Sequence, residues 1–251
     1  MTLEEFFEEH PKIALAFSGG VDSSYLLYAA SRCGADAAAY YVKSQFQPEF
    51  ELRDAIELAH KLGVRMRLIE QDIVSCAEVT ANPPDRCYYC KKHIMGAIRE
   101  RSCADGYALI IDGTNASDDI SDRPGYKALG EEGILSPLRI CGLTKAEIRR
   151  MSHEAGLPTW DKPAYACLAT RIASGEEITA EKLHAVEQSE DYLFSLGFTD
   201  FRVRVRGNGA LLQFTADQTE RAHERFPEIE KKLAEHFDSV TIDPKVREKS
   251  V

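Results

Sequence analysis

The segment Ser18-Gly19-Gly20-Val21-Asp22-Ser23-Ser24 decides the fold of the first part of this 251-residue chain. The apolar run before it predicts a buried strand at residues 13–17, and the residues after it predict a helix at 22–32. Glycines between a strand and a helix let the backbone approach an anion closely. The helix N-terminus adds exposed N–H groups and a favourable dipole. The segment therefore predicts a phosphate-binding loop.

This phosphate loop (residues 18–24) differs from two widespread nucleotide-binding loops. It is not of the Walker type, because no Gly-Lys-Ser/Thr follows, and the Gly-x-Gly-x-x-Gly of dinucleotide-binding folds is absent. An ordinary strand-to-helix turn is the structural alternative, for which two glycines and a capping Ser or Asp suffice. The placement of all seven residues between strand and helix favours phosphate binding.

Strand-like and helix-like segments alternate through the first half of the chain. Further strands are predicted at residues 37–42, 65–70 and 108–112, with an amphipathic helix at 51–62. Strands separated by helices indicate an α/β fold, in which right-handed crossovers build a parallel sheet covered on both faces. Ligands of such sheets bind beyond the carboxyl ends of the strands. A second polar segment, Asp112-Gly113-Thr114-Asn115, is expected at that edge.

The pattern changes in the second half of the chain. Thr144 and Glu147 fit a capping box that opens a helix, and residues 156–175 look irregular. A helix capped by Thr179 follows, and then strands near 201–206, 211–214 and 240–242. We therefore predict a nucleotide-binding domain over residues 1–174 and a small α+β domain for substrate binding or oligomerisation over 175–251.

Composition limits the classes of partner. The chain has 31 Lys and Arg against 41 Asp and Glu, and its net charge of -10 argues against wrapping nucleic acid or binding an anionic membrane. No stretch approaches the roughly 20 apolar residues of a transmembrane helix, and the N-terminus is acidic where a secretory signal is basic. We expect a cytoplasmic protein with a small-molecule substrate, no nucleic-acid partner and no membrane partner.

The seven cysteines, an odd number, do not indicate a disulfide framework. Cys87 and Cys90 form a Cys-x-x-Cys, which fits a redox pair or half of a zinc site, but no second such pair follows. With Cys167 they would supply three thiolates. Such a set suits a 4Fe-4S cluster in which one iron is open to an exogenous ligand. Two buried cysteines on one helical turn are the structural alternative.

Several further motifs carry a family resemblance. The segment WDKPAYACLATRI at residues 160–172, with Arg123-Pro124-Gly125, Ser136-Pro137-Leu138 and the phosphate loop, resembles the LarE family of ATP-dependent sulfur transferases. The family belongs to the PP-loop ATP pyrophosphatases, whose domain is adenine nucleotide alpha hydrolase-like. The resemblance extends to about residue 206. It implies an enzyme that inserts sulfur into pyridinium-3,5-biscarboxylic acid mononucleotide, for the nickel-pincer nucleotide cofactor of lactate racemase.

The resemblance also implies how the sulfur is carried. Family members with three cysteines are thought to use a 4Fe-4S cluster, here on Cys87, Cys90 and Cys167. In the other subtype the cysteine that matches Cys167 gives up its own sulfur and leaves dehydroalanine. We expect sulfide or another sulfur source as co-substrate, and a homo-oligomer.

Roles for single residues follow from the same resemblance. Asp22 would hold Mg²⁺, and ATP would be bound by Ser18, Gly19, Gly20, Asp22, Ser23, Ser24, Gly113 and Thr114. The expected catalytic residues are Cys167 and Glu190 as a base. Arg171 is added because it lies close to Cys167 in the sequence, where a cation stabilises developing negative charge. Arg202 and Arg204 would bind the anionic substrate.

The residues alone leave simpler interpretations open for some of these positions. Arg202, Arg204 and Arg206 alternate with apolar residues and share one strand face, which fits an anion site or a solvated surface. Without the resemblance, Glu190 is interpreted more simply as a glutamate on the exposed face of a helix.

Three other functions use similar motifs. A tRNA thiolase and an amidating ligase such as NAD synthetase both carry a PP-loop, and a non-catalytic regulator would use the loop to sense ATP. An RNA enzyme should show a basic surface, whereas this chain is acidic. An amidating ligase, which uses ammonia, does not require a Cys-x-x-Cys and a third cysteine. Turnover of ATP would distinguish the enzymes from the regulator.

Overall fold

The computed structural model describes residues 1–120 and 124–249 and divides the chain into two compact units. Unit 1 consists of residues 1–73 and 85–162, and unit 2 of residues 74–84 and 163–251. The boundary predicted after residue 174 falls inside unit 2, because the short 3₁₀ helix η2 (Leu168–Arg171) packs with later elements of the chain. Arg123, the first residue of one family motif, lies outside the described residues.

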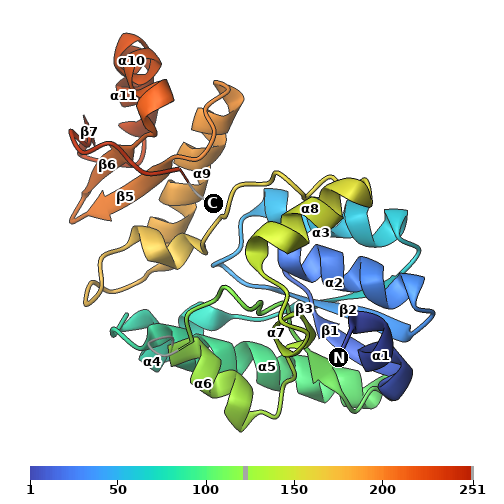
Figure 1. The fold of residues 1–251 in the computed structure, drawn as a ribbon. Coiled ribbons are helices and arrows are strands. Elements are labelled where there is room, and N and C mark those ends of the chain that lie inside the picture. Colours follow the sequence, from blue (N-terminus) through green and yellow to red (C-terminus); the bar gives the residue numbers. More distant parts are fainter. Residues whose placement is uncertain (121–123, 250–251) are drawn as a thin grey trace. The chain divides into compact units, whose positions relative to one another are not determined.

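A four-stranded parallel sheet forms the centre of unit 1 (Figure 1). Its order is β3-β2-β1-β4, with strands β1 (Lys12–Ala16), β2 (Asp36–Lys43), β3 (Arg65–Glu70) and β4 (Ile110–Ile111). The predicted parallel α/β sheet is confirmed, although β4 is shorter than the predicted strand at 108–112. In β1, Ala14 pairs with Ala38 on one side and Ile110 on the other, so β1 is central and adjoins β4.

Helices cover both faces of this sheet, as Figure 1 shows for α2 and α3 on one side and α5 and α6 on the other. Ile13 and Leu15 pack with α1 (Leu3–Glu9), α2 (Val21–Arg32), α3 (Glu49–Lys61), α7 (Pro137–Ile140) and α8 (Lys145–Glu154). Ala14 and Tyr40 pack with α5 (Arg86–Ala104) and α6 (Pro124–Glu131). Successive residues of a strand face opposite sides, and both sides are buried here, so these strands are continuous apolar runs.

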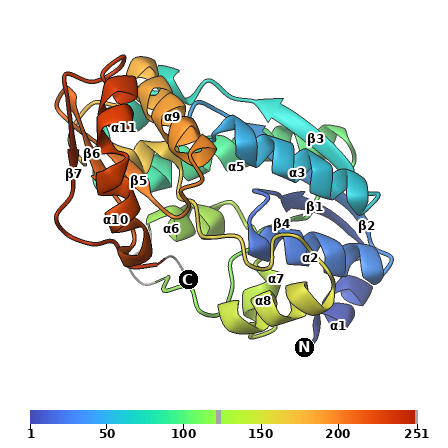
Figure 2. The ribbon, with the colours of Figure 1, turned by 90° about the horizontal axis from the view of Figure 1, so that it is seen from above.

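Unit 2 is an α+β unit built on a second sheet of order β5-β6-β7 (Figure 2). Strands β5 (Arg202–Arg206) and β6 (Gly209–Gln213) form an antiparallel hairpin, and β7 (Ser239–Ile242) pairs with β6 in parallel. Helices α9 (Ala180–Ser195), α10 (Ala216–Glu224) and α11 (Phe226–Leu233) complete it. Thr179 caps α9 as predicted, accepting a hydrogen bond from the Lys182 N–H (3.3 Å).

Residues 74–84, an excursion that interrupts unit 1 in the sequence, also belong to unit 2. The excursion contains most of the 3₁₀ turn η1 (Ile73–Ser75) and all of α4 (Ala77–Thr80). The Asn82 amide donates to the carbonyl oxygens of Ala173 (2.7 Å) and Glu176 (3.1 Å), which ties the excursion to the irregular segment predicted at 156–175. Among the described residues, no helix is long and apolar enough to cross a lipid bilayer.

Candidate functional site

The phosphate loop leaves the carboxyl end of β1 and enters α2. Gly19 has φ +73°, and a Cβ there would lie 3.1 Å from the Cβ of Ala55 on α3, so glycine fits best. The Ser23 hydroxyl donates to the Gly20 carbonyl (3.2 Å) and lies 3.1 Å from the Ser18 hydroxyl. These contacts curl the loop around the first turn of α2, where a helix favours anions.

A second loop meets the phosphate loop because β4, which precedes it, adjoins β1. A Cβ at Gly113 would lie 2.9 Å from the Ser23 backbone nitrogen, so this close approach requires glycine. The Asn115 amide donates to Asp22 Oδ1 (3.2 Å). From β1 the chain runs to β2 and β3 on one side before returning to β4 on the other. Ligands of α/β sheets bind at such a switch point.

Buried Asp112 orders this second loop. Its carboxylate accepts hydrogen bonds from the hydroxyls of Thr114 (2.6 Å) and Ser136 (2.6 Å) and from the Thr114 N–H (3.3 Å). Thr114, a predicted ATP residue, is therefore fixed by Asp112. Ser136 ties the Ser136-Pro137-Leu138 motif to the same site.

Lys145, the first residue of α8, is a site residue that sequence reasoning missed. Its Nζ lies 2.6 Å from Asp22 Oδ2. The capping box of Thr144 and Glu147, confirmed here, fixes the start of α8 and therefore the position of Lys145. A helix dipole disfavours positive charge in its first turn. A lysine at that place is the signal that could have indicated a role outside the helix.

The residues around Asp22 fit a Mg²⁺ ion shared with nucleotide phosphates. Mg²⁺ commonly binds through one or two carboxylates together with phosphate oxygens and water. Asp22 supplies a partly exposed carboxylate at the phosphate loop. Across residues 1–120 and 124–249, no group of three or more His, Cys, Asp or Glu side chains could hold a metal ion by itself. Asp22 would therefore share the ion with phosphates rather than belong to a site made of protein ligands alone.

Cys87 and Cys90 lie in the first two turns of α5, in unit 1. The Cys87 side chain is exposed and accepts a long hydrogen bond from the Arg86 guanidinium (3.7 Å), while Cys90 is half-buried. The alternative of two buried cysteines on one helical turn is therefore wrong. None of the seven cysteines, all in the described part of the chain, forms a disulfide. Thiols at positions i and i+3 share a helix face and suit a soft metal centre chemically.

Cys167 belongs to unit 2 and directly precedes η2, next to a buried ion pair. Arg171 is 0% exposed and Glu190 is 1% exposed, and they form two parallel bonds of 2.9 and 3.0 Å. Burial by itself would lower the pKa of Arg171. The Glu190 carboxylate has the opposite and larger effect, so the pKa of Arg171 is raised. Glu190 also accepts hydrogen bonds from the Val203 N–H (2.9 Å) and the Tyr165 hydroxyl. The interpretation of Glu190 as an exposed helical glutamate is therefore wrong.

Arg202 is buried in unit 2, so the interpretation of its strand face as a solvated surface is wrong at this position. It is 5% exposed, donates to the Ala164 carbonyl (2.7 Å) and lies 3.7 Å from Asp200. Burial and the positive charges of Arg171 and Arg247 lower its pKa to about 10.

Arg204 follows on the same strand and is half-buried. It donates to the side-chain oxygen of Gln213 (2.9 Å) and to the Thr170 carbonyl, and its pKa is also lowered, first by burial. Arg206, at the end of the strand, is exposed. Arg171, Arg202 and Arg204 thus all donate to backbone carbonyls of the segment that carries Cys167.

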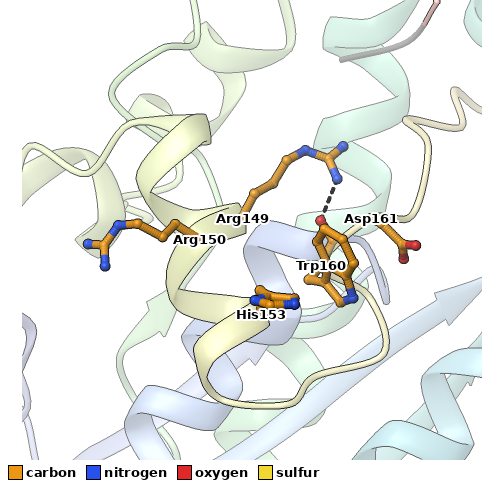
Figure 3. Close-up of a pocket in the computed structure, with 5 residues that line it drawn as sticks. All are labelled: Arg149, Arg150, His153, Trp160 and Asp161. Atoms are coloured by element: carbon orange, nitrogen blue, oxygen red, sulfur yellow. Dashed lines mark hydrogen bonds between the residues drawn. The ribbon is translucent and has the colours of Figure 1, made fainter.

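A separate pocket in unit 1 contains none of the predicted site residues (Figure 3). It measures about 400 Å³ and is lined by Arg149, Arg150, His153, Trp160 and Asp161. Arg149 donates to the carbonyls of Trp160 (2.7 Å) and Lys162 (3.0 Å), so it fastens the start of the 160–172 segment to α8. Trp160 packs edge-on against His153 at 4.5 Å and forms a wall of this pocket.

Comparisons with known proteins find relatives that match most of the chain. No family model matches the chain. An uncharacterized protein of Synechocystis sp. is 39% identical over 217 residues, which cover 86% of this chain and 81% of that protein. The pyridinium-3,5-bisthiocarboxylic acid mononucleotide synthase of Lactiplantibacillus plantarum is 31% identical over 214 residues, covering 84% of this chain and 78% of the synthase.

More distant relatives perform two of the rival functions considered above. The tRNA-specific 2-thiouridylase MnmA of Thermotoga sp. is 26% identical over 189 residues, 58% of this chain and 52% of the enzyme. The NH(3)-dependent NAD(+) synthetase of Hyperthermus butylicus is 26% identical over 209 residues, 78% of this chain and 74% of the enzyme. The chain is thus similar over most of its length to enzymes of nucleotide modification and synthesis.

Proposed function

The chain belongs to the LarE family of ATP-using PP-loop sulfur transferases, and from this premise we propose that it thiolates pyridinium-3,5-biscarboxylic acid mononucleotide. One carboxylate would become a thiocarboxylate, the group that the name of the Lactiplantibacillus relative contains twice. The meeting of the phosphate loop and the β4 loop at Asp22 is the observation that carries the ATP-dependent step. Sulfide is the proposed co-substrate.

The first half-reaction would activate the carboxylate. A carboxylate oxygen attacks the α-phosphorus of ATP, the bond to the β-phosphate oxygen breaks, and pyrophosphate leaves behind an acyl-adenylate. Residues 18–24 and the N-terminus of α2 would bind the pyrophosphate. Lys145 would offset the charge that gathers there, and Asp22 would hold Mg²⁺, which neutralises phosphate charge when bound.

The second half-reaction would exchange AMP for sulfur. A sulfur nucleophile attacks the acyl carbon, AMP leaves with the bonding electrons, and the thiocarboxylate remains. We propose Cys87, Cys90 and Cys167 as thiolate ligands of a 4Fe-4S cluster, which when bound supplies one iron open to external sulfide. The exposure of Cys87 and the one-turn spacing of Cys87 and Cys90 support the two thiolates of unit 1. Cys167, in unit 2, joins the set through the family resemblance, since the described residues contain no three-cysteine metal site.

Residues of unit 2 would bind the substrate and support Cys167. Arg202 and Arg204 are the proposed partners of the substrate's anionic groups. Arg171 would stabilise negative charge near Cys167, since its guanidinium donates to the carbonyl of Ala166 (2.8 Å), the residue before Cys167. Both oxygens of Glu190 already accept hydrogen bonds, so Glu190 acts as a base only if one donor withdraws.

A second candidate makes Cys167 itself the sulfur donor. Its Sγ would attack the acyl-adenylate to give a thioester, and loss of the α-proton would break the Cβ–Sγ bond. The products are the thiocarboxylate and dehydroalanine at position 167. The position of Cys167 at the start of η2, four residues before the buried Arg171, supports this candidate.

A reconstituted reaction tests the proposed activity. The protein is mixed with ATP, Mg²⁺, sulfide and pyridinium-3,5-biscarboxylic acid mononucleotide, and pyrophosphate, AMP and thiocarboxylate are measured. Substrate-dependent release of pyrophosphate with formation of thiocarboxylate supports the proposal. Turnover only with tRNA or with ammonia would identify a rival enzyme, and ATP binding without turnover would identify a regulator.

Iron analysis tests the cluster separately. Anaerobically purified protein should contain about four irons and four sulfides per chain. The Cys87→Ala variant should lose them, whereas Cys103→Ala, which removes another exposed thiol of α5, should keep them. No iron even after reconstitution would contradict the cluster, and dehydroalanine at position 167 after turnover would establish the sacrificial route.

A further inference from the structure

Tyr165 lies two residues before Cys167 and contacts three charged side chains of unit 2. Its hydroxyl donates to Glu190 Oε2. Its ring centroid lies 4.5 Å from the guanidinium carbon of Arg171 and 5.4 Å from that of Arg202, within the range of cation–π attraction. A partly buried phenol between two guanidinium groups has little rotational freedom.

The same two arginines also hold the backbone on either side of Tyr165. Arg202 donates to the Ala164 carbonyl (2.7 Å), and Arg171 donates to the Ala166 carbonyl (2.8 Å). Each arginine therefore binds both the ring and one flanking carbonyl. Charge-assisted hydrogen bonds of this kind are stronger than neutral ones, so residues 164–166 are fixed at three successive positions.

Glu190 connects this clamp to two elements of unit 2. It extends from α9, forms the two bonds to Arg171, and accepts a third hydrogen bond from the Val203 N–H of β5. Tyr165 supplies the fourth. The segment that leads into Cys167 is therefore tied to α9 and β5 through one buried carboxylate.

We propose that Tyr165 is a positioning residue that fixes Cys167 for the sulfur-transfer half-reaction. The inference rests on the proposed function, because that function assigns the sulfur chemistry to Cys167. Removing the hydroxyl breaks the bond between the ring and Glu190, so the segment ahead of Cys167 is held by the two arginines alone. A misplacement of about 1 Å lowers a rate by roughly 100-fold, so sulfur transfer should slow while the half-reaction at the phosphate loop continues.

The test is the rate at which iodoacetamide alkylates Cys167 in the iron-free full-length chain, followed by peptide mass spectrometry. The variant is Tyr165→Phe, which keeps the ring and removes the hydroxyl. The matched control is Tyr192→Phe on α9, and Cys87 in unit 1 is an internal reference within each sample. This assay uses neither ATP nor substrate, so its result does not depend on whether the proposed reaction occurs.

In Tyr165→Phe, iodoacetamide should alkylate Cys167 at least threefold faster than in the wild type. The alkylation rate of Cys87 should not change, and neither should the rate at Cys167 in the Tyr192→Phe control. A smaller increase, a decrease, or an equal increase at Cys87 would overturn the inference. In the coupled reaction the variant should lower kcat for thiocarboxylate formation and leave the KM for ATP unchanged. An active wild type with an unchanged variant would refute the role of Tyr165 alone, whereas an inactive wild type would refute the proposed function.

If Tyr165→Phe fails to fold, Arg202→Lys tests the same clamp. Lysine keeps the positive charge but lacks the planar fork that lets arginine bind the Ala164 carbonyl and the Tyr165 ring together. The same threefold increase at Cys167 is expected, and an unchanged rate would overturn the inference.

Discussion

Replacing Glu190 by glutamine is expected to destabilise unit 2 severely. Glutamine retains the shape of the side chain and an oxygen for the Val203 N–H, but it removes the charge opposite Arg171. Arg171 is 0% exposed, so its guanidinium would stay buried without a counter-charge. Breaking a buried pair in this way costs about 3–5 kcal/mol. At about 2–4 °C per kcal/mol for a chain of this size, Tm should fall by about 6–20 °C.

Urea unfolding followed by far-UV circular dichroism measures this cost, with Glu181→Gln at the start of the same helix as the control. The exposed Glu181 carboxylate accepts hydrogen bonds only from its own N–H and the Thr179 hydroxyl at the start of α9, so its neutralisation should change stability far less than that of Glu190. The double variant Arg171→Met, Glu190→Gln removes the buried positive charge and keeps an acceptor for the Val203 N–H, so it should be less destabilised than Glu190→Gln. A Glu190→Gln cost below about 1 kcal/mol, or a double variant that is less stable than the single one, would refute the reasoning.

Three further predictions concern unit 1. Gly113→Ala places a methyl group 2.9 Å from a backbone nitrogen of the phosphate-loop helix, so pyrophosphate release should fall at least about tenfold; Gly130→Ala, with nothing within 4 Å, should release it normally. Lys145→Gln removes the cation beside Asp22 and should raise the KM for ATP by about tenfold, or about 1.4 kcal/mol; an unchanged KM would exclude a role in ATP binding. Hydrogen bonds from the Thr144 hydroxyl and N–H lower the pKa of Glu147 from its usual 4.5. Its contribution to α8 is therefore complete above pH 4.5 and is lost as the pH falls through the folded value, which hydrogen exchange of the α8 amides measures; protection of α8 that does not change with pH would contradict this.

Much of the nucleotide-binding half could be predicted because its signals are local. The strand, the phosphate loop and α2 follow one another directly, and each carries its own pattern of apolar residues, glycines or caps. The capping box before α8 needs only four residues. Such signals depend on neighbours in the sequence, so they hold before the tertiary structure is known.

Other features depend on partners distant in sequence and could not be predicted in the same way. Helix α5 escaped prediction because its buried residues include Arg86 and Ser102 and do not form a regular apolar stripe. The burial of Glu190 depends on Arg171 and Val203, and the pairing of Lys145 with Asp22 joins residues 123 positions apart. The roles assigned to Cys167, Arg202 and Arg204 stay predictions that await measurement.

Oxygen labelling tests the central claim, ATP-dependent activation of a carboxylate for sulfur transfer, most directly. The substrate carboxylates are labelled with the heavy oxygen isotope, the reaction is run with ATP, Mg²⁺ and sulfide, and AMP is analysed by mass spectrometry. Because AMP leaves with one former carboxylate oxygen, the account predicts one heavy oxygen in each AMP and one thiocarboxylate per AMP formed. Unlabelled AMP, or ADP in its place, would contradict adenylation of the carboxylate and with it the proposed sulfur transfer.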